Sequence, residues 1–210
     1  MLNIALPKGR LGDRVYKMFS DVGYDCSSMA ADSRKLVFED SGRGLRYLLV
    51  KPADVAIYVE RGAADIGVSG RDVLLETGAA VFELLDLKIG ACKVAVAAKR
   101  GWVDDLSLPL RVATKYTSIA QKYYSGINRQ IDIIKLNGSI ELAPILGLSD
   151  VIVDIVETGK TLEENNLEVF QVIDHSSARL IANESSYRFK TGVIDEICGK
   201  MKRVIDTNIR

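Results

Sequence analysis

Residues 138–162 constrain the fold of this chain more than any other stretch. Residues 151–156 are apolar apart from Asp154, and such a run is typical of a buried strand in a parallel sheet. Residues 158–161 (TGKT) follow, and the polar residues 162–166 then predict a short helix. A strand that ends in a small-residue loop and leads into a helix directs several backbone N–H groups at one point, which is a geometry for binding phosphate.

Two carboxylates, Asp154 and Glu157, lie beside this loop. Carboxylates do not favour a phosphate alone, so the ligand is expected to carry ribose hydroxyls as well, or a Mg²⁺ ion that needs oxygen ligands. The stretch therefore predicts a sugar-phosphate site. The alternative interpretation is an acidic strand end followed by an ordinary capped helix.

Gly159-Lys160-Thr161 also matches the end of the P-loop motif GxxxxGK[ST], whose first glycine would stand at Asp154. A carboxylate there would lie inside the phosphate cradle. An ordinary P-loop NTPase is therefore disfavoured.

The beginning of the chain repeats the strand–loop–helix order. Residues 2–6 predict a strand, residues 7–10 (PKGR) a basic loop, and the apolar spacing of residues 11–22 an amphipathic helix. A basic loop at a helix N-terminus indicates a second anion site. The alternative is that Lys8 and Arg10 are solvated surface charges.

Composition excludes several classes of protein. Lys and Arg together number 28, as do Asp and Glu, so neither nucleic acid nor an acidic membrane surface is an expected partner. There is no apolar run long enough to span a membrane, and the chain starts directly with a strand rather than a secretory signal, so a cytoplasmic protein is expected. Cys26, Cys92 and Cys198 are far apart and His175 is the single histidine; reduced thiols and no protein metal site are predicted.

Hydrophobic periodicity and turn residues predict the other elements. Strands are expected at 35–38, 45–50, 65–69, 82–87, 93–98, 111–114, 131–136, 169–173 and 178–182, and helices at 54–61, 70–78 and 118–124, after Gly138-Ser139, and from Thr191. No repeat or flexible linker interrupts the chain. The order predicts two compact α/β lobes.

The spacing around residues 141–162 resembles the signature of the ATP phosphoribosyltransferase family, in its short form. The matching positions are Glu141, Gly147-x-Ser149, Ile152-x-Asp154-Ile155 and Thr158-Gly159-x-Thr161-Leu162. The resemblance extends to Leu6-Pro7-Lys8-Gly9-Arg10, to residues 62–72 and to Ala113-Thr114-Lys115-Tyr116.

The resemblance implies an α/β, two-lobed fold like that of type II periplasmic binding proteins, without a C-terminal regulatory domain. Lobe one, on the nucleotide side, would comprise residues 1–90 and 179–210, and lobe two, which binds phosphoribosyl pyrophosphate (PRPP), residues 91–178. Ligands of such folds lie beyond the carboxyl ends of strands, so one cleft is expected among the loops. These loops are 7–10, 70–72, 114–116 and 154–161.

The implied reaction joins N1 of the adenine of ATP to C1 of PRPP and releases pyrophosphate, with Mg²⁺ accompanying the substrates. It is the first step of histidine biosynthesis. A neutral ring nitrogen is a modest nucleophile, so orientation and stabilisation of the leaving charge must supply most of the catalysis.

The resemblance also assigns residues to roles. The predicted PRPP-binding residues are Thr158, Gly159, Lys160 and Thr161 for the 5-phosphate, Asp154 and Glu157 for the ribose hydroxyls, and Glu141. The predicted catalytic residues are Arg10 and Arg34, which would stabilise the pyrophosphate, and the predicted ATP-binding residues are Lys8, Gly9, Lys51, Gly70, Asp72 and Tyr116. Two alternatives stay open: Glu141 as an ordinary carboxylate at a helix N-terminus, and Tyr116 as an ordinary core aromatic.

The resemblance further implies a regulatory subunit related to histidyl-tRNA synthetase, in a hetero-octamer with a homodimer as building block. Two other classes compete. A two-lobed solute-binding protein would share the fold but would carry a signal peptide and lack a PRPP loop. A generic nucleotide-binding regulatory module would bind ATP without transferring anything to it.

Overall fold

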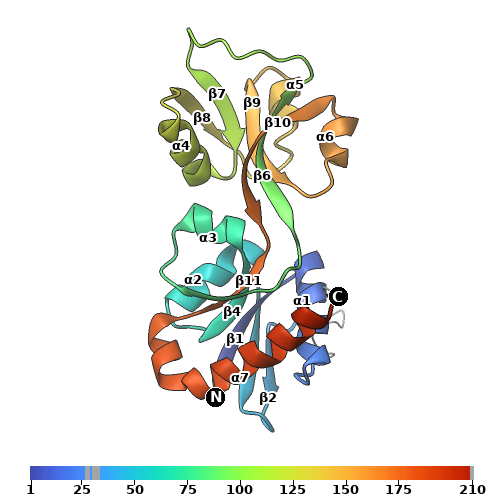
Figure 1. Ribbon diagram of the computed structural model, residues 1–210, viewed down its shortest axis with the longest axis vertical. Helices are drawn as coiled ribbons and strands as arrows, with labels where there is room; N and C mark the ends of the chain where they lie inside the picture. Colours follow the sequence, from blue (N-terminus) through green and yellow to red (C-terminus); the bar gives the residue numbers. More distant parts are fainter. Residues whose placement is uncertain (27–28, 30–33, 209–210) are drawn as a thin grey trace. The chain divides into compact units, whose positions relative to one another are not determined.

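The computed structural model describes residues 1–26, 29 and 34–208 (Figure 1). The chain forms two compact units: unit 1 comprises Met1–Gly90 and Ser177–Arg210, and unit 2 comprises Ala91–Ser176. Each unit has its own β-sheet with helices packed against it. The expected two-lobed α/β fold is therefore confirmed, with the chain passing into unit 2 and back.

Unit 1 contains a six-stranded sheet with the order β2-β3-β1-β4-β11-β5. Its strands are β1 (Leu2–Pro7), β2 (Val37–Asp40), β3 (Leu45–Val50), β4 (Ile66–Gly70), β5 (Phe82–Asp86) and β11 (Ala178–Ala182). Strand β1 is parallel to both of its neighbours, β3 and β4, whereas β2, β11 and β5 pair antiparallel. The carboxyl ends of β1, β3 and β4 consequently meet at one edge of this sheet.

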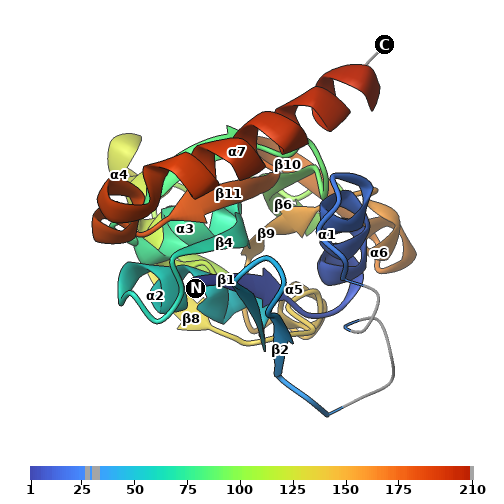
Figure 2. The same ribbon diagram turned by 90° about the horizontal axis from the view of Figure 1, so that it is seen from below.

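Helices cover both faces of this sheet (Figure 2). Helices α1 (Arg10–Asp21) and α7 (Glu184–Asn208) pack on one face, where Ile4 of β1 meets Phe19 and Ile197. Helices α2 (Val55–Glu60), preceded by the 3₁₀ turn η2 (Pro52–Asp54), and α3 (Arg71–Thr77) pack on the other face around Ala5. Because side chains alternate along β1, this strand contributes residues to the hydrophobic cores on both faces of the sheet.

Helix α7 begins at Glu184, and the helix predicted from Thr191 forms its second segment, after a kink. The helix is interrupted at Lys190, whose φ of −125° and ψ of 23° are not helical. Before the interruption, Asn183 Oδ1 accepts a hydrogen bond from the Ser186 N–H at 2.9 Å, which caps the helix. This first segment carries no continuous apolar stripe, so hydrophobic periodicity revealed only the part after Lys190.

Asp65 joins three parts of unit 1. Its carboxylate accepts hydrogen bonds from the Asn3 N–H at 2.7 Å, from Ser186 Oγ at 2.7 Å and from Lys190 Nζ at 2.8 Å. Burial alone raises the pKa of Asp65, but these hydrogen bonds outweigh it and hold the pKa below its ordinary value. The carboxylate therefore stabilises the folded state where it is ionised.

Asp65→Asn is expected to lower the free energy of unfolding by about 2 kcal/mol at neutral pH, because hydrogen bonds to a charged group are lost. The pKa of Asp65 in the folded state lies below its value in the unfolded state, which is about 3.9. The stability that this carboxylate contributes is therefore fully present above the unfolded pKa and is lost as the pH falls through the folded pKa. Urea titrations from neutral to acid pH should thus show that the free energy of unfolding falls less at acid pH in the variant than in the wild-type protein. Asp54→Asn, at an exposed carboxylate of the same unit, is the control; equal stability and equal acid slopes would contradict the prediction.

Unit 2 contains a five-stranded sheet with the order β10-β6-β9-β7-β8. Its strands are β6 (Cys92–Lys99), β7 (Leu110–Thr114), β8 (Ile131–Lys135), β9 (Val151–Val156) and β10 (Leu167–Ser176), and its helices are α4 (Thr117–Gly126), α5 (Leu142–Ile145) and α6 (Lys160–Glu164). Strand β7 is parallel to β8 and β9, whereas β6 is antiparallel to β9 and β10. The expected parallel strand at 151–156 is therefore parallel on one side only.

Helices α5 and α6 share one face of this sheet, where Ile140 and Leu162 contact Ala113 and Ile152. In the described part of the chain, no helix is both long and apolar enough to cross a membrane. Cys26, Cys92 and Cys198 form no disulfide in the described part of the chain, and of the three Cys26 is the buried one.

Candidate active site

The predicted phosphate loop lies at the carboxyl edge of the unit 2 sheet. After β9 the chain turns at Gly159, whose φ of 82° lies in the left-handed region that favours glycine, and α6 begins at Lys160. The Lys160 N–H points to Thr158 Oγ1 at 3.4 Å, and the first backbone bond of the helix runs from the Glu163 N–H to Gly159 O at 3.1 Å. The N–H groups of Thr161 and Leu162 have no intrahelical partner, so they are available to an anion.

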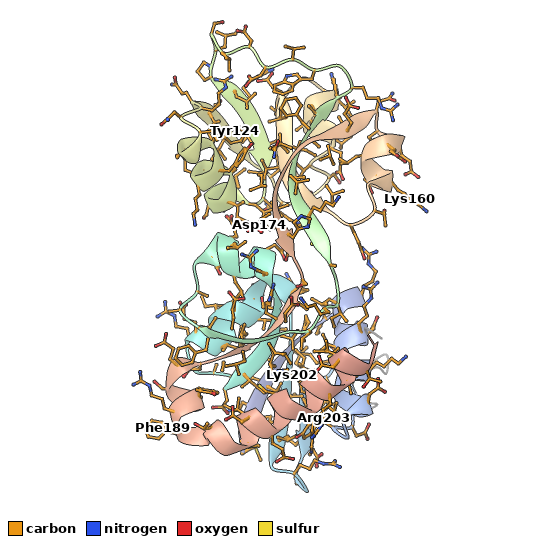
Figure 3. All side chains as sticks on the ribbon, viewed as in Figure 1. Tyr124, Lys160, Asp174, Phe189, Lys202 and Arg203 are labelled. Carbon is orange, nitrogen blue, oxygen red and sulfur yellow. The ribbon has the colours of Figure 1, made fainter. Side chains whose placement is uncertain are left out.

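The side chains of this loop are open to solvent. Thr158, Lys160 and Thr161 are exposed, and Figure 3 shows Lys160 at the beginning of α6 on the outside of the unit. Glu157, directly after β9, is exposed as well. The loop thus combines backbone N–H groups, two hydroxyls and one ammonium within four residues, 158–161.

Asp154 lies near the same end of β9, and its side chain is 19% exposed. Alternation along the strand places it on the face of Ile152, which is the face that α5 and α6 cover. Burial raises the pKa of the Asp154 carboxyl, and the charge of Glu141 raises it further, whereas Lys115 opposes the shift. Glu141 therefore lies close enough to Asp154 for its charge to affect that carboxyl.

Glu141 immediately precedes α5, but its side chain makes no capping hydrogen bond to that helix. Glu141 does lie at a helix N-terminus, so the alternative of an ordinary carboxylate at that position stays open. Its position beside Asp154 agrees with a role in shaping the sugar-phosphate pocket, which stays a prediction.

Tyr116 follows β7 and is only 5% exposed. The Lys115 ammonium lies 4.8 Å from the centre of its ring. Burial and this cation–π contact favour the alternative interpretation, in which Tyr116 is a packed core aromatic. Stacking of adenine on this ring would require the side chain to move.

Four predicted site residues gather at the carboxyl edge of the unit 1 sheet. Lys8 follows β1 and Lys51 follows β3, and the Lys8 N–H donates to Val50 O at 2.9 Å, so the two loops are adjacent. Gly9, with a φ of 80°, turns the chain into α1, which begins at Arg10. Lys8, Arg10 and Lys51 are all exposed.

Arg34 reaches the same edge by a different route. Strand β2 is antiparallel to β3, so the residues that precede it lie beside the carboxyl end of β3. The hydrogen bond from the Leu49 N–H to Leu36 O, at 2.8 Å, extends this pairing toward Arg34. In the described part of the chain, Lys8, Arg10, Arg34 and Lys51 are not paired with carboxylates. Such a group of unpaired cations favours an anionic ligand.

The start of α1 is held tightly against β1. Tyr16 donates its hydroxyl proton to Pro7 O at 2.8 Å, and a Cβ at Gly12 would collide with the same carbonyl oxygen. This close approach requires glycine at position 12 and fixes the direction in which Arg10 leaves the loop.

Gly70 is the last residue of β4, and Asp72 follows it at this third carboxyl end. Asp72 is buried in the first turn of α3, and its carboxylate folds back so closely that a Cβ at Gly70 would collide with it. A carboxylate at this position is favourable for the helix dipole. The structure thus gives both residues a role in the local fold, and ATP binding by them stays a prediction.

Lys115 is the residue that the sequence did not assign to the site. Its ammonium nitrogen lies 3.6 Å from Asp154 Oδ1. The position of Lys115 directly after a predicted parallel strand was a signal, because carboxyl ends of neighbouring strands collect at one edge. Nothing in the sequence, however, shows that β7 and β9 are neighbours.

Unit 2 also contains a cavity of about 560 Å³ between α4, the loop before β7 and the start of β10. Trp102, Leu110, Tyr124 and Phe170 are among its lining residues, and none of the predicted site residues is. Because Leu110 begins β7, this cavity lies toward the amino edge of the parallel strands, away from Asp154. It is distinct from the predicted sugar-phosphate site.

Comparison with known proteins agrees with this geometry. Residues 51–203 match the family model described as HisG: ATP phosphoribosyltransferase. The ATP phosphoribosyltransferase of Brachyspira hyodysenteriae is 57% identical over 206 residues, which cover 98% of this chain and all of that protein. The ATP phosphoribosyltransferase of Caldicellulosiruptor bescii is 50% identical over 209 residues, with 98% and 100% covered.

Solved structures give the same result. The ATP phosphoribosyl transferase (HisG:HisZ) complex from Thermotoga maritima contains a chain with a TM-score of 0.86 and 34% identity, and each chain is covered completely. The similarity therefore includes both units and the two carboxyl edges described above. Together, the family model, the relatives and the fold show that this chain belongs to the ATP phosphoribosyltransferase family.

Proposed function

We propose that this chain performs the family reaction and that its predicted site residues carry it out. As an ATP phosphoribosyltransferase, it joins N1 of the adenine of ATP to C1 of PRPP and releases pyrophosphate, in the first step of histidine biosynthesis. The observation that carries the residue assignment is the end of β9, where Asp154, the left-handed Gly159 and the first turn of α6 follow one another.

In this proposal the loop at 158–161 binds the 5-phosphate of PRPP through backbone N–H groups and the threonine hydroxyls. Asp154 accepts hydrogen bonds from the ribose 2- and 3-hydroxyls, with Glu157 close enough to share them, and Glu141 shapes the pocket. Each contact fixes the position of C1 before reaction. The chemistry of the donor groups fits a sugar phosphate better than a phosphate alone.

The leaving pyrophosphate gains negative charge as its bond to C1 breaks. Arg10 and Arg34 offer planar forks that match phosphate oxygens, and Lys8 and Lys51 add positive charge at the same edge. These exposed cations, which have no carboxylate partner among the described residues, stabilise such a charge more in the transition state than in the ground state.

We place Mg²⁺ with the substrates. In the described residues no group of three or more His, Cys, Asp or Glu side chains is arranged to hold a metal ion. Mg²⁺ commonly binds through substrate phosphates with few protein ligands, so the ion is expected to arrive on PRPP and ATP. No step of the proposed mechanism passes through a protein-bound metal.

The test of the proposed function is product formation. Mixing the protein with ATP, PRPP and MgCl₂ should give an absorbance change from the N1-substituted adenine together with released pyrophosphate. The assay needs arms with and without a HisZ-type subunit. ATP binding with no product in either arm would contradict the proposal and favour a nucleotide-binding module.

We further propose that the chain assembles with a HisZ-type regulatory subunit, since a solved structure that matches it throughout is a HisG:HisZ complex. Feedback by histidine requires a second site coupled to the catalytic one through two states of different affinity. We expect the isolated chain to be insensitive to histidine and the reconstituted complex to be inhibited. Histidine titrations at saturating PRPP and at its KM measure this; strong inhibition of the chain alone, with calorimetric binding to it, would contradict the expectation.

A further inference from the structure

Lys115 occupies a central position in the unit 2 site although no role was assigned to it. It directly follows β7, and its side chain is 38% exposed. Its ammonium nitrogen lies 3.6 Å from Asp154 Oδ1 and 4.8 Å from the centre of the Tyr116 ring. The ammonium group is thus held between a carboxylate and an aromatic face.

The backbone around Lys115 is fastened to β9 beside Asp154. Thr114, which is fully buried, donates its hydroxyl proton to Val153 O at 2.6 Å and accepts a hydrogen bond from the Tyr116 N–H at 2.8 Å. These two bonds fix the residues on either side of Lys115 relative to the residue before Asp154. The fold therefore holds the backbone positions of Lys115 and Asp154 close together, unlike a chance pair of mobile surface side chains.

The two oxygens of Asp154 have different surroundings. Oδ1 accepts a hydrogen bond from the Ile155 N–H at 2.8 Å and is the oxygen nearer to Lys115. Oδ2 has no hydrogen-bond partner in the described part of the chain. One oxygen is thus occupied by the protein, and the other remains available to a hydroxyl group.

The charge balance of the site also depends on Lys115. Burial and the neighbouring Glu141 both raise the pKa of Asp154, and Lys115 is the side chain that opposes them. Two carboxylates close together in a partly buried place repel each other. A single cation between the strand ends compensates this repulsion.

We propose that Lys115 is a positioning residue that holds the Asp154 carboxylate by Oδ1, so that Oδ2 faces the ribose hydroxyls of PRPP. Lys115 acts through Asp154 and does not contact the substrate. This inference rests on the proposed function of the site and adds to it the residue that orients its ribose-binding group.

The test is a double-mutant cycle with Lys115→Met and Asp154→Asn, measured as kcat/KM for PRPP and as the Kd of PRPP by calorimetry. Lys115→Met alone is expected to lower kcat/KM for PRPP about tenfold and to leave the KM for ATP unchanged. In the Asp154→Asn background the same change should have less than about a twofold effect, because residues that act as a unit are not additive. Lys115→Arg keeps the charge and should restore most of the loss.

Lys122→Met, at an exposed lysine on α4, is the matched control and should behave as wild type. Equal losses from Lys115→Met in both backgrounds would show that Lys115 contacts the substrate, and would overturn the inference. Wild-type kinetics in a folded Lys115→Met protein, checked by circular dichroism, would also overturn it, as would failure of Lys115→Arg to restore activity. Absence of product from the wild-type protein would instead refute the proposed function, and the calorimetric cycle would still decide whether Lys115 acts through Asp154.

Discussion

Replacing Arg10 by alanine is expected to slow the chemical step about 100-fold, with little change in the affinity for ATP. The reason is that negative charge develops on the leaving group during the reaction. Pyrophosphate becomes a stronger anion as it leaves C1, so a guanidinium beside it stabilises the transition state more than the bound substrate. Arg10 is exposed at the first residue of α1, directly after the left-handed Gly9, where a side chain can reach a ligand at the carboxyl edge of the sheet.

Rapid-mix single-turnover experiments separate this effect from weaker binding, because they report the chemical rate at saturating substrate. Arg10→Lys should recover only part of the rate, since an ammonium lacks the planar fork. Lys17→Ala removes a cation from an exposed position of the same helix and should leave the rate unchanged. A higher KM with an unaltered chemical rate in Arg10→Ala would refute a role in leaving-group stabilisation.

Asp154→Asn is expected to reduce turnover at least about tenfold. The amide is nearly isosteric, so the packing of β9 should survive, but it is a weaker acceptor for the ribose hydroxyls. It also leaves Lys115 without its carboxylate partner. The loss should therefore appear with PRPP as the varied substrate rather than with ATP.

Steady-state kinetics with PRPP as the varied substrate measure this prediction, and circular dichroism verifies the fold. Asp132→Asn, at an exposed position of β8 in the same unit, provides a control with the same chemical change. Unchanged kinetics in a correctly folded Asp154→Asn protein would remove Asp154 from the site. Asp54→Asn, the control for Asp65→Asn, makes the same chemical change at an exposed position of unit 1.

Local residue patterns predicted the secondary structure at both carboxyl edges. The apolar run before Asp154, the small residues at 158–161 and the basic PKGR loop are short-range patterns. Strands β9 and β1 and helix α1 formed close to where those patterns predicted them, whereas α6 begins at Lys160, two residues before the predicted start. Strand–loop–helix geometry depends on residues close together in the chain, so the same pattern also predicts the phosphate-binding loop. The α/β class and the family followed from the same stretches.

Tertiary structure decided which of these pieces are neighbours. The pairing of β7 with β9 places Lys115 beside Asp154, and the antiparallel β2 returns Arg34 to the carboxyl end of β3. Neither contact has a signature in the sequence, because strand order depends on the packing of the whole sheet rather than on local residue spacing. Only the fold could show this.

Burial and capping were also decided by the tertiary structure. Tyr116 was equally compatible with stacking or packing until the fold buried it, and α7 began earlier than its apolar stripe because Asn183 caps a polar first segment. The alternation and periodicity of a sequence report which face of an element is apolar. They do not report what that face meets, and in this protein that contact determines whether a residue serves the core or the site.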